Sequence, residues 1–334
     1  MPRNGTGQYI APASSWNPGV NGVTAQTADF NALLDDLEAG LTQSVSSDGQ
    51  TPMTGNLPMG NNRITGLANG VAVTDAAALG QVVRNIGQCR LTKSGSNLLL
   101  SPYQGNQLAI NGALYTIPSA GVTLAPGSVT PSTLYYIYAY MVGTTMTLEA
   151  STTGHSTDIN TGVEIKTGDS TRTLVGMARP ITGPLWQDAA NQRFVVSWFN
   201  RPTVTLTAAF TANRGISSVG YGEMNSEIRN EFLVWAGQGV QITASGSVSN
   251  GTAAFMNAAI GVDSSSTAQD SFASGNVAVN GQFPIGQSLP ISTLAEGYHF
   301  ATLLGSTSTG TAVFLGSATP GVRCTVGSTI PGGA

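Results

Sequence analysis

Residue types that could carry out chemistry are few in this sequence and stand far apart. The 334 residues include two histidines, His155 and His299, and two cysteines, Cys89 and Cys324. A zinc site needs three or four Cys and His ligands at short spacing, and a disulfide framework needs several cysteines. Because neither pattern occurs, we expect no metal ion, no cofactor and two ordinary thiols. We expect His155 in a solvated turn and His299 as a structural residue of a strand.

Motifs for nucleophilic catalysis and phosphate binding are also missing. The chain has no Gly-x-Ser-x-Gly motif and no phosphate-binding loop. A Ser-His-Asp triad stays open, because its members come together only in the folded chain. The sequence therefore gives no motif that would make this protein an enzyme.

One group of carboxylates could serve a glycan depolymerase. Glu223, Glu227 and Glu231 follow one another at intervals of four residues, and glycosidic cleavage needs two carboxylates about 5–10 Å apart. On a helix the three would share a face, where like charges are unfavourable unless they are solvated or paired. Arg214 and Arg229 could neutralise them, so we interpret the group as a surface ion network. A depolymerase remains the enzymatic alternative.

The composition excludes two further classes of function. Only 9% of the residues are charged, the formal net charge is −4, and Lys and Arg form no cluster, so we expect no binding of nucleic acid. No apolar run approaches the roughly 20 residues that span a bilayer, so we expect no membrane insertion. The first residues contain no apolar stretch typical of a secretory signal, which predicts synthesis in the cytoplasm.

The elements that must position these residues begin with one amphipathic helix over residues 27–46. Its apolar side chains recur three and four residues apart and form a single stripe: Phe30, Leu33, Leu34, Leu37, Leu41 and Val45. An isolated helix of this length is marginal in water, so the stripe must pack on something. Symmetry-related copies, another protein of the same particle, or this subunit itself could cover it. A second helix is expected over residues 75–86.

From Cys89 onward the pattern changes to strands. Asn111-Gly112 predicts a type I′ hairpin turn within residues 108–115, and further strands are expected at 134–141, 146–149, 172–178 and 193–199. Asn200-Arg201-Pro202 suggests a domain boundary, since proline cannot continue a central strand. Eight short strands then alternate with Gly, Ser and Asn turns, which favours an antiparallel β-sandwich, and we expect the jelly-roll order: 203–209, 231–236, 239–248, 252–262, 276–279, 298–304, 311–315 and 322–326.

The segment 48–67 fits neither the helical nor the strand period. Its apolar residues stand at irregular gaps among two prolines and four glycines: Met53, Leu57, Met59, Ile64 and Leu67. Residues 73–82 follow with a capped helix start that includes Asp75-Ala76. Together they resemble the M-T-G-N-L-x-M-x-x-N-x-I-x-x-L … A-x-x-x-D-A signature of bacteriophage tail fibres, and the head of the chain is similar to that of podovirus-type fibres. The strands at 298–304 and 311–315 also resemble the last hairpin of trimeric jelly-roll domains of the C1q and tumour-necrosis-factor group.

The resemblance implies a homotrimer in the tail of a virion, mainly β, with a short α-helical anchor. It implies three regions: a virion-attachment region at 1–88, a central β-rich domain at 89–200 and a C-terminal β-sandwich at 201–334. The N-terminal region would bind tail or adaptor proteins through the apolar residues named above. The C-terminal domain would bind a host surface glycan or outer-membrane protein, with Tyr221, Trp235 and Tyr298 as candidate contacts, although each is also a plausible core residue. An adaptor that docks another fibre is the structural alternative.

Overall fold

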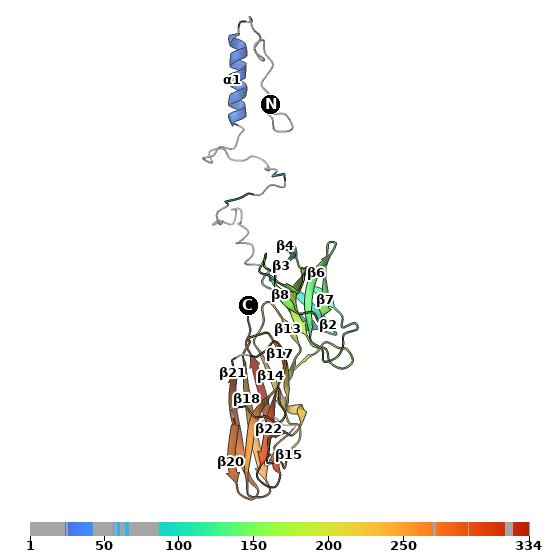
Figure 1. Ribbon diagram of the computed structural model, residues 1–334, viewed down its shortest axis with the longest axis vertical. Helices are drawn as coiled ribbons and strands as arrows, with labels where there is room; N and C mark the ends of the chain where they lie inside the picture. Colours follow the sequence, from blue (N-terminus) through green and yellow to red (C-terminus); the bar gives the residue numbers. More distant parts are fainter. Residues whose placement is uncertain are drawn as a thin grey trace. The chain divides into compact units, whose positions relative to one another are not determined.

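The computed structural model describes two compact units, 1–76 and 77–334, which we treat separately (Figure 1). The described residues are 24, 26–42, 56, 59–60, 64–66, 87–269, 272–292, 294–317 and 323–333. The expected helix at 75–86 lies outside them, as do Val45, Met53, Leu57 and Leu67. None of the helices in these ranges is long and apolar enough to cross a membrane.

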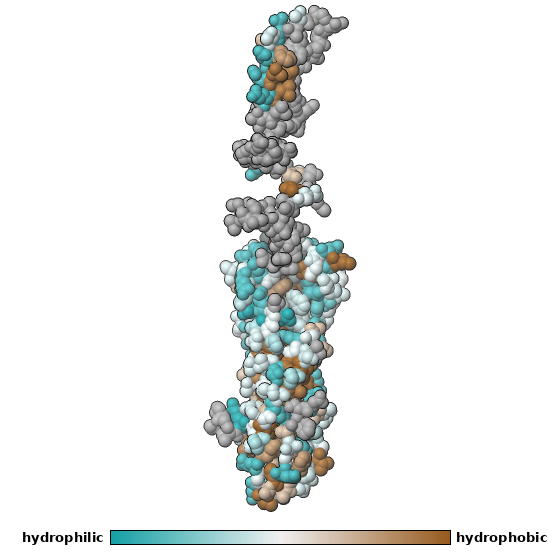
Figure 2. Space-filling view, turned by 90° about the vertical axis from the view of Figure 1, so that its left-hand side faces the viewer, coloured by the Kyte–Doolittle hydropathy of each residue, from teal (hydrophilic) through white to brown (hydrophobic). Residues whose placement is uncertain are grey.

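The first unit contains the helix α1, Thr27–Thr42. This confirms the amphipathic helix as far as Thr42. Leu34 is 48% exposed and Leu37 is 40% exposed, while Leu33 is half-buried. Figure 2 shows the apolar strip beside a hydrophilic face of the helix. The stripe therefore remains largely exposed within a single chain.

The first part of the second unit is built from three antiparallel sheets. β3 and β4 form the hairpin expected at Asn111-Gly112, whose φ angles of 50° and 73° suit a type I′ turn. One core holds the three sheets together, with Leu91, Leu108 and Ile137 almost fully buried. The first sheet has the order β1 (Cys89–Ser94), β2 (Asn97–Pro102) and β5 (Val122–Leu124), and the second is the pair β3 (Gln107–Ile110) and β4 (Ala113–Thr116). The third sheet has the order β7 (Thr145–Ser151), β6 (Tyr135–Val142), β10 (Asp169–Ala178), β9 (Glu164–Lys166) and β8 (His155–Thr157), and β13 (Val195–Ser197) also pairs with β10.

The remaining strands form two sheets around a second core, which makes the C-terminal part a β-sandwich (Figure 1). Phe232 and Phe314 reach this core from opposite sheets. One sheet has the order β11 (Asp188–Ala189), β12 (Gln192–Arg193), β17 (Asn230–Val234), β22 (Gly297–Thr307), β19 (Ala254–Val262) and β20 (Phe272–Val277), with β16 (Gly222–Glu223) on β22. The other has the order β14 (Val204–Ala209), β24 (Thr325–Ile330), β18 (Val240–Asn250), β23 (Ala312–Phe314) and β15 (Arg214–Ile216), with β21 (Gly281–Ile291) on β18.

Close approach of the two sheets depends on a glycine. A Cβ atom on Gly305 would lie 2.5 Å from the ring of Phe314. The phenylalanine can therefore fill the core only because β22 has no side chain at this position. Ile242 and Leu303 fill the layer beside it and are fully buried.

The mainly β fold is confirmed. Several details differ from the expectation: short strands such as β5, β15 and β16 were not expected, and three further differences concern the sandwich. β21 was not expected, since Pro284 and Pro290 weigh against a strand; it pairs only with β18, at the edge of its sheet. β12 pairs with β17 in parallel, so the sandwich is not purely antiparallel. β11 and β12 precede the expected boundary at 200–202 but join a sheet of the sandwich.

Candidate functional site

Four loops meet at the end of the sandwich that lies away from the central sheets (Figure 1). We call them the tip loops: residues 217–221, 251–253, 278–280 and 308–311. These loops form because Gly, Ser, Thr and Asn, which favour turns, stand between the strands. Their sequence contains no Asp, Glu, Lys, Arg or His. The tip loops are thus an uncharged surface of hydroxyl, amide and apolar groups.

Asn250 holds two of the tip loops in place. It is 2% exposed, and its side-chain nitrogen donates to Thr307 Oγ1 at 3.1 Å and to the Thr309 carbonyl at 3.0 Å. Its side-chain oxygen accepts from the backbone and the hydroxyl of Thr252, each at 3.0 Å. The amide of Thr307 also donates to the Ser218 carbonyl. A buried network that satisfies its members in this way gives loops a defined shape.

Apolar side chains stand exposed on and beside these fixed loops. Val219 is 80% exposed, Val279 is 63% exposed, and Phe255 at the start of β19 is 41% exposed. Figure 2 shows apolar side chains at the surface at this end of the sandwich. Exposed apolar side chains on an uncharged surface make this end of the sandwich the candidate contact surface. Sequence reasoning missed them: Val279 fell in the expected strand 276–279, whereas Val219 stands alone between Ser and Gly, which was a usable signal.

The three aromatic candidates for host contact occupy different environments. Trp235 is 2% exposed, and its indole donates to the Ser197 carbonyl at 3.0 Å, so its side chain is not presented to a ligand. Trp235, which directly follows β17, is therefore a core residue, and this corrects its choice as a host contact. Tyr298 is half-buried and donates to Glu231 at 2.5 Å beneath the guanidinium of Arg179. Tyr221 is half-buried at the end of a tip loop.

The three glutamates do not share a helix: Glu227 lies in a short 3-10 helix, η2 (Ser226–Ile228), whereas Glu223 is in β16 and Glu231 in β17. Each has a partner. Arg229 forms two bonds to Glu223, at 2.6 and 2.7 Å, and Arg214 bonds Glu227 at 2.7 Å. The first two carboxylates therefore form the ion pairs expected from the sequence, and the third accepts the Tyr298 hydroxyl. Each of the three carboxylates is thus held by a cation or a hydroxyl group, and the side chain of Glu223 is only 8% exposed.

His155 occupies a different place from the one expected. Its Nδ1 lies 2.6 Å from Glu164 and its Nε2 lies 3.2 Å from Glu296, where the imidazole is only 17% exposed. Tyr136 donates to the other oxygen of Glu296 at 2.6 Å, and the Trp235 ring lies 5.8 Å from the imidazole. The expectation of a solvated turn is wrong, because β8 pairs with β9 and brings His155 against the sandwich.

These contacts shift the pKa values of His155 and Glu296, the two residues that bridge the central sheets and the sandwich. The hydrogen bond to Glu296 raises the pKa of His155, against the effect of burial. Burial alone would raise the pKa of Glu296, but the bonds from His155 and Tyr136 lower it below its ordinary value. Both shifts favour an imidazolium–carboxylate pair. We call His155, Glu164, Glu296, Tyr136 and Trp235 the junction.

His299 and the cysteines are structural, as expected. Nδ1 of His299 lies 2.7 Å from Asp263 and its Nε2 lies 2.9 Å from the Ala295 carbonyl, so both ring nitrogens have partners. Cys89 and Cys324 are buried and unbonded to each other. Burial raises the pKa of the Cys89 thiol to about 12, which keeps it protonated and unreactive. The described residues hold no group of three or more potential metal ligands.

The residues expected to anchor the chain are described only in part. Ile64 is 64% exposed, Met59 is half-buried, and Phe30 is 51% exposed. The backbone of Leu41 belongs to α1, but the environment of its side chain lies outside the description. The anchor role of these residues stays a prediction.

Comparison with known proteins gives only distant similarities. No protein-family model matches the chain, and no curated protein matches it significantly. Among solved structures, the insecticidal delta-endotoxin Cry8Ea1 from Bacillus thuringiensis shares 9% identity over 74% of this chain and 52% of its own, with a TM-score of 0.23. This chain therefore spans about half the length of the toxin. A structure of infectious bursal disease virus, Gx strain, shares 14% identity over 73% of both chains, with a TM-score of 0.21. The subviral particle of VP2 from infectious bursal disease virus shares 14% identity over 74% of this chain and 76% of its own, with a TM-score of 0.19. TM-scores this low assign neither a fold family nor a function.

Proposed function

We propose that this protein is a trimeric tail-fibre protein of a bacteriophage virion, fastened to the tail by its N-terminal region and bound to the host surface by its C-terminal sandwich. The signature at 48–67 and the helix stripe support the anchor. In this proposal the sandwich has a jelly-roll order, and the protein is structural rather than enzymatic. It is synthesised in the host cytoplasm and assembled into the tail.

The tip loops carry the host-binding half of the proposal. Val219, Phe255 and Val279 are exposed apolar groups on an uncharged surface, and Asn250 fixes two of the four loops that form it. A receptor binder benefits from such preorganisation, since less conformational entropy is lost on binding. The missing charge favours a neutral contact surface, which a host glycan or an outer-membrane protein can offer.

Binding of labelled full-length protein to host cells tests this directly. We expect saturable binding that competes with phage adsorption, and loss of both in the double variant Val219→Ser, Val279→Ser. Treating the cells with periodate or with a protease separates a glycan from a protein receptor. Val142→Ser is the matched control, because Val142 is 58% exposed but belongs to β6 of the central sheet. Equal binding by the double variant would refute the tip as the contact, and capture of another tail protein by the tip would favour the adaptor.

The exposed stripe of α1 supports the trimer. Leu34 and Leu37 are too exposed to contribute to the stability of a lone chain, and three copies packed on this stripe would bury them. Sedimentation equilibrium should give three times the chain mass of 34.1 kDa. Replacing both leucines by Asp should lower the mass, whereas Asp35→Asn on the same helix should not. A wild-type monomer would refute this half of the proposal.

A further inference from the structure

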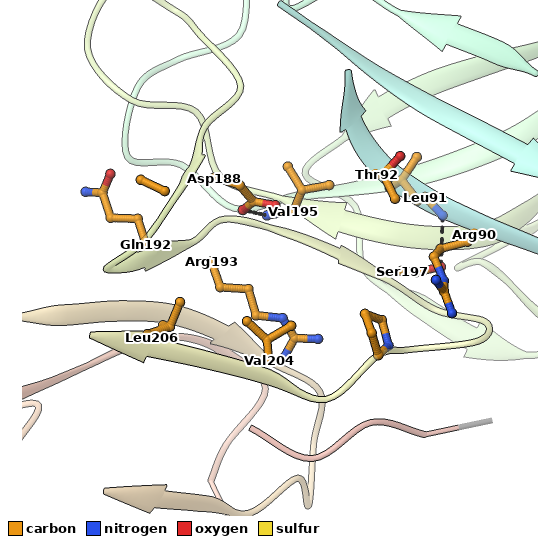
Figure 3. A pocket seen from close by; sticks show the side chains of 12 residues that line it. Arg90, Leu91, Thr92, Asp188, Gln192, Arg193, Val195, Ser197, Val204 and Leu206 are labelled. Atoms are coloured by element: carbon orange, nitrogen blue, oxygen red, sulfur yellow. Dashed lines mark hydrogen bonds between the residues drawn. The ribbon is translucent and has the colours of Figure 1, made fainter. Parts of the chain in front are cut away.

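A pocket of about 170 Å³ lies where the central sheets meet the sandwich (Figure 3). Its walls come from β1, from the β11–β13 segment and from β14, so residues before and after position 200 line it together. Val204 and Leu206 form an apolar side, while Arg90, Asp188 and Arg193 supply charged groups. The pocket is separate from the junction and from the tip loops.

Arg193 is a buried cation with a guanidinium nitrogen that has no hydrogen-bond partner, although the carboxylate of Asp188 is near enough to interact with its charge. Arg193 is 4% exposed, and the nitrogen without a partner is its buried Nη1. Among the described residues no carboxylate forms an ion pair with it. Figure 3 shows its guanidinium within the pocket, close to Val204. Burial lowers its pKa to about 10, which still leaves it charged at neutral pH. A buried donor of a charged group without an acceptor is costly, so Nη1 of Arg193 indicates a missing acceptor.

Asp188 interacts with the charge of Arg193 but forms no ion pair or hydrogen bond with it, and its carboxylate binds the backbone instead. One of its oxygens accepts the amides of Phe194 at 2.6 Å and of Val195 at 3.0 Å. Burial raises its pKa to about 6 despite these bonds. The carboxylate fixes the turn between β12 and β13 and leaves the guanidinium of Arg193 unsatisfied.

Positive charge dominates the surroundings of the pocket. Arg90 lines it and is held in place by a bond of 2.8 Å from its Nε to the Asn200 carbonyl and by the ring of Tyr103. The charge of Lys93 acts to lower the pKa of Asp188, and the charge of Arg201 acts to lower the pKa of Arg193. Both cations therefore add to the positive potential. Two guanidinium groups and one carboxylate thus line the pocket, and the complementary ligand is an anion.

We propose that this pocket binds a small oxyanion, held by Arg193 and drawn in by Arg90. Guanidinium groups bind phosphate, sulfate and carboxylate with charge-assisted hydrogen bonds that match their geometry. The volume corresponds to about five or six water molecules at roughly 30 Å³ each, which leaves room for a phosphate or for the carboxylate end of an acidic sugar. The bound anion would join the central sheets to the sandwich. This site is independent of the proposed host binding.

Thermal unfolding and calorimetric titration of the full chain test the site. The probes are sodium phosphate, sodium sulfate and sodium glucuronate, each against sodium chloride at equal ionic strength. We expect a saturable rise in Tm and a saturable heat with at least one oxyanion, since a ligand of the native state stabilises it. Saturation by the inorganic ions identifies a free ion as the ligand, and saturation by glucuronate alone identifies an acidic sugar.

Two variants locate the effect. Arg193→Met keeps the length of the side chain and should remove the response, and Arg193→Lys should weaken the affinity on the order of tenfold through loss of one charge-assisted bond. Arg214→Met, on the exposed pair with Glu227, is the control and should respond like the wild type. If Arg193→Met does not fold, saturable broadening of the phosphate 31P signal by wild-type protein, competed by sulfate, tests binding alone. Equal responses in wild type and Arg193→Met, or none with any oxyanion, overturn the proposal.

Discussion

The junction and the tip loops occupy opposite ends of the sandwich and use opposite chemistry. At the junction, His155 lies between Glu164 and Glu296, in contact with aromatic rings. At the tip loops there is no charged side chain, and Val219 and Val279 face solvent. In a chain with only 9% charged residues, the pair of His155 with Glu296 joins the central sheets to the sandwich. The surface left without charge is the one suited to a neutral partner.

Among the variants that test this difference between the two ends, Trp235→Ala should reduce the stability most. The variant removes a buried indole and its bond to Ser197, so unfolding free energy should fall by about 3–5 kcal/mol. Chemical denaturation measures the change. Phe255→Ala, beside the tip loops, should cost much less because its ring is already 41% exposed. Similar losses in both variants would remove the distinction between the two ends.

A smaller and pH-dependent effect is expected for His155→Gln. The imidazolium pair contributes stability below the unfolded pKa of 6.5, and that contribution is lost as pH rises through the raised folded pKa. The lowered pKa of Glu296 has the opposite effect on stability. Its stabilising contribution is present above pH 4.5, the ordinary pKa of a glutamate, and is lost as the pH falls through the folded pKa. Tm of the wild type should therefore be highest between those pH values.

The variant should lose roughly 1–3 kcal/mol in that window, because two carboxylates lose a charged donor. It should approach the wild type as pH rises above the folded pKa of His155. Denaturation curves at several pH values measure both. A loss that is constant across pH would assign His155 a packing role instead of a charge.

His299→Gln should be milder than His155→Gln in the same measurement. Its partner Asp263 is 45% exposed, so solvent screens the pair, and we expect a loss within about 1 kcal/mol. The pKa of His299 is raised by Asp263, so this loss too should shrink as pH rises. A larger loss of stability than in His155→Gln would show that His299, inside the sandwich, contributes more to stability than His155.

The smallest effect on stability is expected at Val279→Ser. An exposed apolar side chain contributes little to folding, so the change should stay within about 0.5 kcal/mol. Cell binding of the same variant should nevertheless fall. A stable variant that binds normally would show that the tip is exposed without being a contact surface.

Sequence patterns predicted the local elements of this fold better than its tertiary contacts. The Asn111-Gly112 turn was predictable because a type I′ hairpin is a local requirement. β21 was not, because the open edge that tolerates Pro284 and Pro290 depends on how β18 pairs elsewhere. His155 shows the same limit for the site. Its partner Glu296 stands 141 residues away, and no local pattern joins them.

The two prolines of β21 also affect how crowded copies of this protein behave. A strand paired along one side accepts proline only where the missing N–H would point outward, away from its neighbour. The open edge of that sheet therefore lacks two of the donors that a strand from another molecule would need. Chains brought side by side would be discouraged from merging their sheets into aggregates.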